Sequence, residues 1–121
     1  MTTILIVDTR PTDRQLYTAL LGSFGYRVLE AGDGSEALEL ARTELPDLVI
    51  TDIIMPGMEG IETIRTLRRT HPELKVIAMS GGGRMKPESY LEVAKAFGAV
   101  RVFSKPFDNE ELFAAIEDAL E

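Results

Sequence analysis

Four residues whose side chains could together hold a divalent cation and a phosphoryl group follow the apolar stretches of this chain. They are two carboxylates, a hydroxyl and an ammonium group: Asp8, Asp52, Ser80 and Lys105. Carboxylate oxygens are ligands that Mg²⁺ prefers, while a lysine and a hydroxyl can bind phosphoryl oxygens by charge and by hydrogen bonding. These residue types predict metal-assisted phosphoryl chemistry, provided that the fold brings the four side chains together.

The apolar stretches that must position these residues have the length of β-strands and alternate with amphipathic stretches of helix length. We predict strands at residues 3–7, 26–30, 48–51, 75–79 and 99–103. Five strands alternating with five helices are typical of an α/β fold, in which a parallel sheet is covered by helices on both faces. The second and fifth strands contain charged residues, so we expect them at the edges of the sheet.

The polar residues are predicted to meet at one edge of this sheet. In an open parallel sheet, ligands bind beyond the carboxyl ends of the strands. Asp8, Asp52 and Ser80 each come directly after a predicted strand, and Lys105 comes shortly after the last one. Taken singly, each residue is explained by a turn or by solvent, and only their coincidence favours a functional site. Asp47 precedes its strand, so we expect it at the opposite edge, in a solvated turn.

The helices carry their own boundary signals. Asp33 with Glu36, and Asp108 with Glu111, have the spacing of a capping residue and its reciprocal partner. The first helix is expected from Pro11 to Phe24, with one apolar stripe toward the sheet. The stripe is predicted to contain Leu16, Tyr17, Leu20, Leu21 and Phe24.

Length and composition exclude several classes of function. Because 121 residues fit one domain, we expect a single domain, 1–121, and no output domain. With 13 basic and 20 acidic residues the net charge is −7, which disfavours binding to nucleic acid or to an anionic membrane. Cysteine is absent, which excludes disulfides and thiolate chemistry. No apolar run is long enough to span a bilayer and no signal peptide is recognisable, so we expect a cytoplasmic protein.

Four blocks of the sequence, taken together, resemble a known family. They are "ILIVD", "DLVITDIIMPGMEG", "VIAMS" and "VFSKPF". They are similar to the corresponding blocks in the receiver domain of bacterial two-component response regulators, the family of the chemotaxis response regulator. The resemblance runs along essentially the whole chain, and it implies a doubly wound, flavodoxin-like fold with a five-stranded parallel sheet in the order 2-1-3-4-5 and five helices.

The resemblance implies that Asp52 is the phosphoacceptor, which receives its phosphoryl group from the phosphohistidine of a sensor histidine kinase or a histidine phosphotransfer protein. Asp8, Asp52 and the backbone carbonyl of Ile54 would hold Mg²⁺, the implied cofactor. A carboxylate is a poor nucleophile toward an anionic phosphoryl group unless cations neutralise the charge, and Mg²⁺ would do so. Gly57 and Gly60 are expected to serve backbone turns beside Asp52.

A switch is also implied by the resemblance. Lys105 would pair with the phosphoryl oxygens, Ser80 would bond one of them, and Phe103 would reorient when Ser80 moves. By its pattern alone, Phe103 would be assigned to the core. A downstream protein partner would bind the surface of the fourth helix, fifth strand and fifth helix. We expect neither nucleic acid nor a membrane to bind this domain, and we do not expect a turnover enzyme.

The chain departs from the family at Thr9. The family usually has two adjacent acidic residues after the first strand, and the second is a direct Mg²⁺ ligand. A threonine hydroxyl is a weak neutral ligand, and Arg10 adds a positive charge nearby. We expect weakened metal binding, because Asp8 and Asp52 still provide two carboxylates and Mg²⁺ commonly manages with that number. Asp13 lies inside the first predicted helix and is not expected to substitute.

Three functional hypotheses remain open at this point. The first is a phosphorylated switch, which the intact Asp52, Ser80 and Lys105 favour. The second is a degenerate receiver that binds partners without phosphorylation, which only Thr9 favours. The third, a small phosphatase or another flavodoxin-like enzyme, is disfavoured because no general acid or base lies beyond these residues and no glycine fingerprint follows the first strand.

Overall fold

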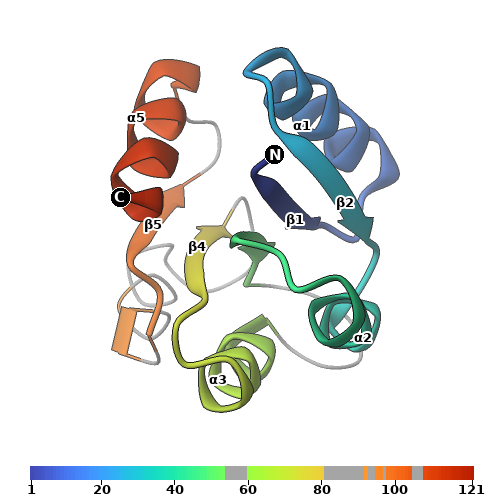
Figure 1. Cartoon of the computed structure of the whole chain (residues 1–121), viewed down its shortest axis with the longest axis vertical. Helices are drawn as coiled ribbons and strands as arrows, with labels where there is room; N and C mark the ends of the chain where they lie inside the picture. Colours follow the sequence, from blue (N-terminus) through green and yellow to red (C-terminus); the bar gives the residue numbers. More distant parts are fainter. Residues whose placement is uncertain (54–59, 81–91, 93–94, 97, 105–107) are drawn as a thin grey trace.

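The protein forms a five-stranded parallel sheet in the order β2-β1-β3-β4-β5, as a computed structural model shows (Figure 1). The structure describes residues 1–53, 60–80, 92, 95–96, 98–104 and 108–121. This order confirms the predicted fold and the predicted edge strands. The strands are β1 (Thr3–Val7), β2 (Arg27–Ala31), β3 (Leu48–Asp52), β4 (Lys75–Ser80) and β5 (Arg101–Ser104).

Helices cover both faces of the sheet. Figure 1 shows α1 and α5 on one side of the strands and α2 and α3 on the other. The helix predicted between the fourth and fifth strands falls largely outside the described residues, as do Ile54, Gly57 and Lys105. Within the described residues the helices are α1 (Pro11–Ser23), α2 (Gly34–Glu44), α3 (Gly60–Thr70) and α5 (Asn109–Leu120).

Two apolar clusters, one on each face of the sheet, form the core. Successive side chains of a strand point to opposite faces, so β1 supplies Leu5 and Val7 to one cluster and Ile4 and Ile6 to the other. The first cluster includes side chains of α2 and α3, and the second includes side chains of α1 and α5. Burying each such aliphatic side chain stabilises the fold by about 2 kcal/mol, so the central strands form a rigid support for their polar ends.

The observed strand boundaries differ from the predicted ones by one or two residues. Asp52 is the last residue of β3 and Ser80 the last residue of β4, so these strands continue through the polar residues instead of ending before them. Backbone pairing explains the difference, because Asp52 lies opposite Met79 and the Ile53 amide donates to the Met79 carbonyl at 2.9 Å. β2 begins one residue later than predicted and β5 two residues later.

One residue of the predicted stripe on α1 is wrongly assigned. Leu16 is 65% exposed, whereas Leu21 is fully buried and Tyr17 and Leu20 pack against the core from its margin. Leu16 lies five residues before Leu21, which is about 140° around a helix of 3.6 residues per turn. The helix therefore buries a narrower face than the apolar pattern indicates.

Asp33 and Asp108 are both confirmed as capping residues, and the amide that each binds agrees with the predicted spacing at one helix only. The Asp33 side chain accepts a hydrogen bond from the Glu36 amide at 2.8 Å, as its spacing predicts. The Asp108 side chain instead accepts from the Glu110 amide at 2.8 Å, one residue before the predicted partner Glu111. Both caps satisfy a backbone donor that the first helical turn leaves unpaired.

Candidate functional site

Two carboxylates lie at the ends of neighbouring central strands. Val7 of β1 is paired with Thr51 of β3, so the residues that follow them, Asp8 and Asp52, occupy equivalent places at the carboxyl edge of the sheet. Asp8 is fully buried and Asp52 is 7% exposed. Buried carboxylates are costly and are usually paired or bound to metals, so two at adjacent strand ends indicate a functional site.

The Asp8 carboxylate belongs to a tight turn between β1 and α1. Its Oδ1 atom accepts a hydrogen bond from the Arg10 amide at 2.9 Å. The Asp8 amide donates to the Ala31 carbonyl at 3.1 Å, which extends the pairing of β1 with β2 by one step. The Asp8 carbonyl accepts from Nη1 of Arg14 at 2.8 Å. β2 and α1 thus hold the backbone of Asp8, and the Arg10 amide holds its carboxylate.

The backbone around Asp52 is held by a close approach of α3. An ideal Cβ atom on Gly60, the first residue of α3, would lie 2.3 Å from the Asp52 carbonyl oxygen and equally close to Ile53 backbone atoms. The Gly60 amide donates to the Ile53 carbonyl at 2.8 Å, and the Thr51 hydroxyl donates to the Asp52 carbonyl at 3.0 Å. Only glycine fits here, and the reason is the close approach of α3 to this backbone and not the expected turn, because Gly60 begins a helix and has no positive φ.

Ser80 brings an unsatisfied hydroxyl to the same edge. It is 1% exposed, and its Oγ atom has no hydrogen-bond partner within the described part of the chain. Leaving a buried hydroxyl unpaired costs about 1 to 3 kcal/mol, so natural proteins rarely do so without a reason. The hydroxyl is therefore available to a ligand at the end of β4, the strand beside β3.

Phe103 lies where its apolar pattern predicts, in the core. It is 6% exposed, pairs with Met79 across β4 and β5, and packs in the cluster on the α5 side of the sheet. The guanidinium carbon of Arg101 lies 5.3 Å from the centre of the Phe103 ring. The predicted reorientation of this ring stays a prediction, as do the roles of Ile54 and Lys105.

The oxygen donors at this edge fit Mg²⁺ bound by few protein ligands. Asp8 and Asp52 are carboxylates, and Thr9 beside them is half-buried. Among the residues that the structure describes, no group of three or more His, Cys, Asp or Glu side chains is arranged to hold a metal. Mg²⁺ keeps several waters and is often bound by one or two carboxylates with phosphate oxygens, so the chemistry of the two carboxylates is compatible with this ion.

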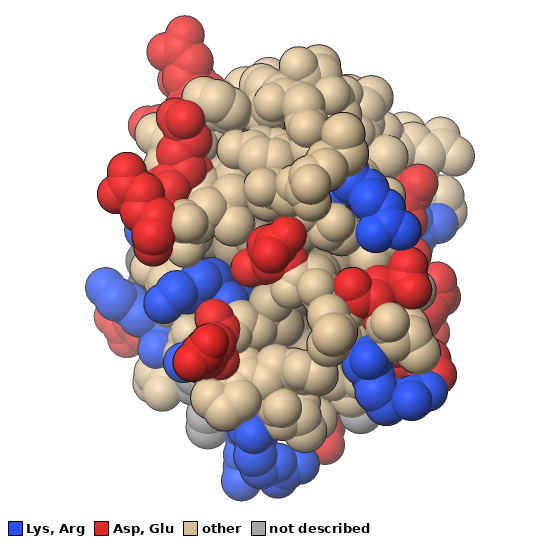
Figure 2. Space-filling view, in the orientation of Figure 1, with Lys and Arg blue, Asp and Glu red and all other residues tan. Residues whose placement is uncertain are grey.

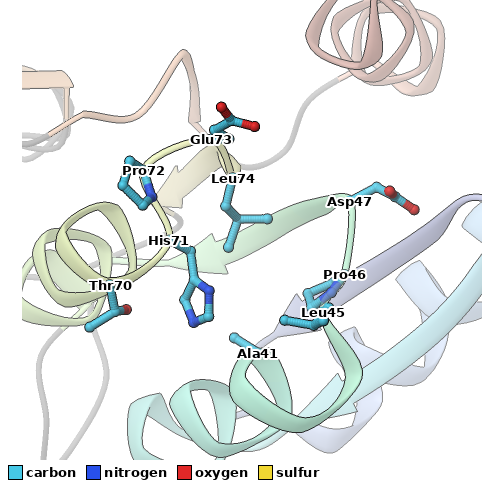
Figure 3. Close-up of a pocket in the computed structure, with 9 residues that line it drawn as sticks. All are labelled: Ala41, Leu45, Pro46, Asp47, Thr70, His71, Pro72, Glu73 and Leu74. Atoms are coloured by element: carbon cyan, nitrogen blue, oxygen red, sulfur yellow. The ribbon is translucent and has the colours of Figure 1, made fainter.

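The opposite edge of the sheet is built differently. Asp47, exposed before β3, accepts a hydrogen bond from the Thr3 amide at 2.8 Å and donates its own amide to the Thr3 carbonyl at 2.8 Å. This confirms that Asp47 lies away from the site, but it gives the residue a structural role that the sequence did not indicate. A groove of about 540 Å³ lies nearby (Figure 3), lined by Ala41, Leu45, Pro46, Asp47, Thr70, His71, Pro72, Glu73 and Leu74.

The titratable groups of this groove do not converge. Figure 3 shows the His71 ring directed into the groove, whereas the carboxylates of Asp47 and Glu73 point away from it. The His71 amide donates to the Leu67 carbonyl at 2.8 Å, just past the end of α3. The arrangement gives no reason to place chemistry at this edge.

Charge is unevenly distributed over the surface. Figure 2 shows acidic side chains along the α5 side of the molecule and basic side chains at the α3 end. The first turn of α5 contains Glu110 and Glu111, and the last turn of α3 contains Arg68 and Arg69.

None of the described helices is both long and apolar enough to cross a bilayer.

Two residues near the site were not found from the sequence. Arg14 contacts the Asp8 carbonyl from α1, and Thr51 contacts the Asp52 carbonyl from within β3. Each acts on a backbone atom of a candidate site residue, and neither interrupts the apolar pattern of its element in a distinctive way. Only the register of the strands and the direction of α1 identify them.

The comparisons with known proteins agree with this geometry. Residues 4–117 match the family model described as the response regulator receiver domain. The chain is 34% identical to the sporulation initiation phosphotransferase F of Bacillus subtilis, with coverage of 97% of this chain and 92% of that protein. It is 37% identical to protein PilH of Pseudomonas aeruginosa, with coverage of 99% and 98%. A crystal structure of a response regulator receiver domain protein from Clostridium thermocellum superposes with a TM-score of 0.92 at 30% identity, over 99% of this chain and 94% of that one. The chain therefore belongs to the response regulator receiver domain family.

Proposed function

We propose that Asp52 accepts a phosphoryl group from the phosphohistidine of a sensor histidine kinase or a histidine phosphotransfer protein. A carboxylate oxygen of Asp52 forms a bond to phosphorus while the bond between phosphorus and the imidazole nitrogen breaks, and the electron pair of that bond stays on the imidazole. The name of the Bacillus subtilis relative, a phosphotransferase, supports phosphoryl transfer as the chemistry of this protein.

Asp8, Asp52 and the backbone carbonyl of Ile54 hold Mg²⁺ in this proposal, and Lys105 pairs with the phosphoryl oxygens. When bound, Mg²⁺ supplies positive charge that offsets the repulsion between the carboxylate and the phosphoryl group. The burial of Asp8 and Asp52 supports this, because electrostatic interactions strengthen where water is excluded. The rigid Asp8 turn keeps one of these oxygens in place before the phosphoryl group arrives.

The single observation that carries the proposal is the unsatisfied Ser80 hydroxyl beside these buried carboxylates. A phosphoryl group on Asp52 offers Ser80 a charged acceptor, which makes a stronger hydrogen bond than a neutral one. The bond draws Ser80 toward the phosphoryl group, and Phe103 of β5 repacks in response. Phosphorylation of Asp52 thereby changes the surface formed by β5, by α5 and by the helix predicted from the sequence between β4 and β5, where a downstream protein binds.

A beryllofluoride phosphoryl mimic with Mg²⁺ tests the switch. We expect amide shifts that extend from Asp52 through Ser80 to β5 in wild type, and shifts that stop near Asp52 in Ser80→Ala. Shifts confined to the neighbours of Asp52 in wild type would contradict a switch.

The second candidate function is a degenerate receiver that binds partners without phosphorylation. Thr9 favours it, because the residue occupies the half-buried position beside Asp8 and supplies no charge. This candidate predicts that the protein fails to bind Mg²⁺ even when beryllofluoride is present.

The phosphorylation itself is tested by intact-mass measurement after incubation with a small phosphodonor and Mg²⁺. We expect a gain of one phosphoryl group in wild type and none in Asp52→Asn. Asp47→Asn is the matched control, because it makes the same chemical change at the opposite edge, and it should be labelled like wild type. Equal labelling of Asp52→Asn would show that the assignment is wrong.

A further inference from the structure

One arginine links three elements beside the carboxyl edge of the sheet. Nη1 of Arg14, in the first turns of α1, donates to the Asp8 carbonyl at 2.8 Å. Nε of the same guanidinium donates to Oε1 of Glu30 in β2 at 3.2 Å. The Arg14 side chain is 21% exposed, so most of it is withdrawn from solvent.

The chain leaves room for this side chain at Gly32. An ideal Cβ atom at Gly32 would lie 3.3 Å from Nη1 of Arg14, which is tighter than an ordinary contact. Gly32 follows β2 directly and has no unusual backbone angle that would call for glycine. A side chain at position 32 would therefore press on the guanidinium, and glycine leaves the space beside it open.

The hydrogen bond to the Asp8 carbonyl fixes more than one atom. The Asp8 carbonyl and the Thr9 amide belong to one rigid peptide plane. The orientation of that plane sets the direction of the chain into Arg10, whose amide donates to Oδ1 of Asp8 at 2.9 Å. The guanidinium thus acts on the Asp8 carboxylate through two steps: it holds the peptide plane, and the plane holds the amide that orients the carboxylate.

We propose that Arg14 is a positioning residue for the metal-binding carboxylate of Asp8. The inference rests on the proposed function in so far as Asp8 binds Mg²⁺. In a receiver with a carboxylate at position 9, two adjacent side chains share the metal. With Thr9 here, the orientation of Asp8 carries a larger part of metal binding. Groups that orient a metal ligand typically change metal affinity by about 10- to 100-fold when they are removed.

A different role for Arg14 predicts the opposite result. If its charge acted mainly by repelling Mg²⁺, removing the charge would strengthen metal binding, and a lysine would behave like arginine. If it acted by position, lysine would restore only part of the effect, because its single ammonium group cannot reproduce the fixed fork of a guanidinium. Arg14→Met and Arg14→Lys therefore separate the two roles.

The chain provides a matched control for a merely structural effect. Arg27, at the start of β2, forms an ion pair with Glu44 of α2 at 3.2 Å, the same distance as the pair of Arg14 with Glu30. That pair also links a helix to β2, but it lies at the other end of the strand. Partly exposed ion pairs contribute little to stability, so Arg14→Met and Arg27→Met should both remain folded.

The experiment measures Mg²⁺ affinity and the hydrogen-exchange rate of the Arg10 amide in wild type, Arg14→Met, Arg14→Lys and Arg27→Met. We expect Arg14→Met to weaken Mg²⁺ binding by about 10-fold and to accelerate exchange of the Arg10 amide beyond any change in global stability. Arg14→Lys should be intermediate, and Arg27→Met should match wild type in both measurements.

The outcomes that overturn the proposal are distinct from those that overturn the proposed function. Unchanged or tighter Mg²⁺ binding in Arg14→Met, or an unchanged Arg10 amide, shows that Arg14 does not position Asp8. Failure of wild type to bind Mg²⁺ contradicts the proposed metal site instead. In that case the exchange rate of the Arg10 amide, measured without metal, still decides whether Arg14 holds the turn.

Discussion

Aspartate residues lie at both edges of the sheet, but they are buried at one edge and exposed at the other. At the carboxyl edge Asp8, Asp52 and Ser80 are buried. At the amino edge Asp47 is exposed and shares a reciprocal pair of hydrogen bonds with Thr3, each 2.8 Å long. The groove of about 540 Å³ lies at the amino edge, where the titratable groups do not converge. Burial of carboxylates, more than the presence of an opening, distinguishes the edge at which chemistry is expected.

The two edges also differ in how their polar groups affect stability. The two hydrogen bonds between Asp47 and Thr3 pair the backbone amide of each residue with an oxygen atom of the other, and they join the starts of β1 and β3. Ser80 buries a hydroxyl that the described residues do not satisfy, which costs stability. Natural proteins tolerate such costs mainly where a ligand or a reaction requires them. We therefore expect substitutions of Asp47 to change stability alone, and substitutions at the carboxyl edge to change metal binding or phosphorylation as well.

The largest expected effect is a loss of stability when a side chain is added at Gly60, behind the carboxyl edge. In Gly60→Ala the new methyl group meets backbone atoms of Asp52 and Ile53 at 2.3 Å, and backbone cannot move aside as a flexible side chain would. We expect a loss of about 3 kcal/mol in the free energy of unfolding. Chemical denaturation measures it.

Gly22→Ala is the matched control for that substitution. Nothing lies within 4 Å of an ideal Cβ atom on Gly22, and the residue is inside α1. Alanine should stabilise the helix there by up to about 1 kcal/mol. Equal changes in the free energy of unfolding for the two substitutions would show that α3 does not pack tightly against the backbone of Asp52.

The second-largest effect is expected in Mg²⁺ affinity, when a substitution at Thr9 introduces a second carboxylate beside Asp8. Thr9→Asp should bind Mg²⁺ at least several-fold more tightly than wild type. Two charges a few ångströms apart near a protein surface interact by about 1 kcal/mol or more, and about 1.4 kcal/mol corresponds to tenfold in affinity. The difference should shrink when beryllofluoride supplies further oxygen ligands. Titration of Mg²⁺ into both proteins, with and without the mimic, measures this, and equal affinities without it would place Thr9 away from the metal.

The third effect lies at the amino edge and should appear in stability alone. Asp47→Ala removes the acceptor for the Thr3 amide and should lower the free energy of unfolding by about 1 kcal/mol. Asp47→Asn keeps an acceptor and should cost less. Neither substitution should change Mg²⁺ affinity or phosphorylation, as measured by titration and intact mass. A loss of labelling in either variant would remove the contrast between the edges.

The smallest effect is a pH dependence near the amino edge. Burial, and then the negative charge of Glu117, raise the pKa of Tyr26 above its usual value. The folded state therefore retains the phenol proton at pH values where the unfolded state has lost it. Stability should decline as the pH rises above about 10, the usual pKa of tyrosine, toward the folded pKa. Tyr26→Phe should flatten this decline in denaturation curves, and Glu117→Gln should reduce it. An identical decline in Tyr26→Phe would assign it to other groups.

The fold was predictable because its strongest signals are local. The apolar stretches and the helix-capping residue Asp33 predict the elements, and charges in the second and fifth strands predict the edges. Leu16 was assigned wrongly because the width of the buried face of a helix depends on what it packs against. Sequence alone does not contain that width.

Of the candidate site, the sequence predicted only the placement of the residues at the strand ends. Asp8, Asp52 and Ser80 stand out because polar residues end apolar strands, and the parallel topology then brings them to one edge. Arg14 and Thr51 act on backbone carbonyls, and Asp47 pairs with a residue 44 positions away. Contacts between side chains and distant backbone atoms leave no regular spacing in the sequence.

The most direct test of the contrast between the edges is to locate the phosphoryl group on the chain. An aspartyl phosphate is reduced by borohydride to homoserine, so peptide mass spectrometry after phosphorylation and reduction identifies the modified residue. We expect homoserine at position 52 and unmodified aspartate at positions 8 and 47. Homoserine at position 47, or at position 8 without position 52, would contradict the proposal that buried carboxylates at the carboxyl edge divide into one acceptor and one metal ligand.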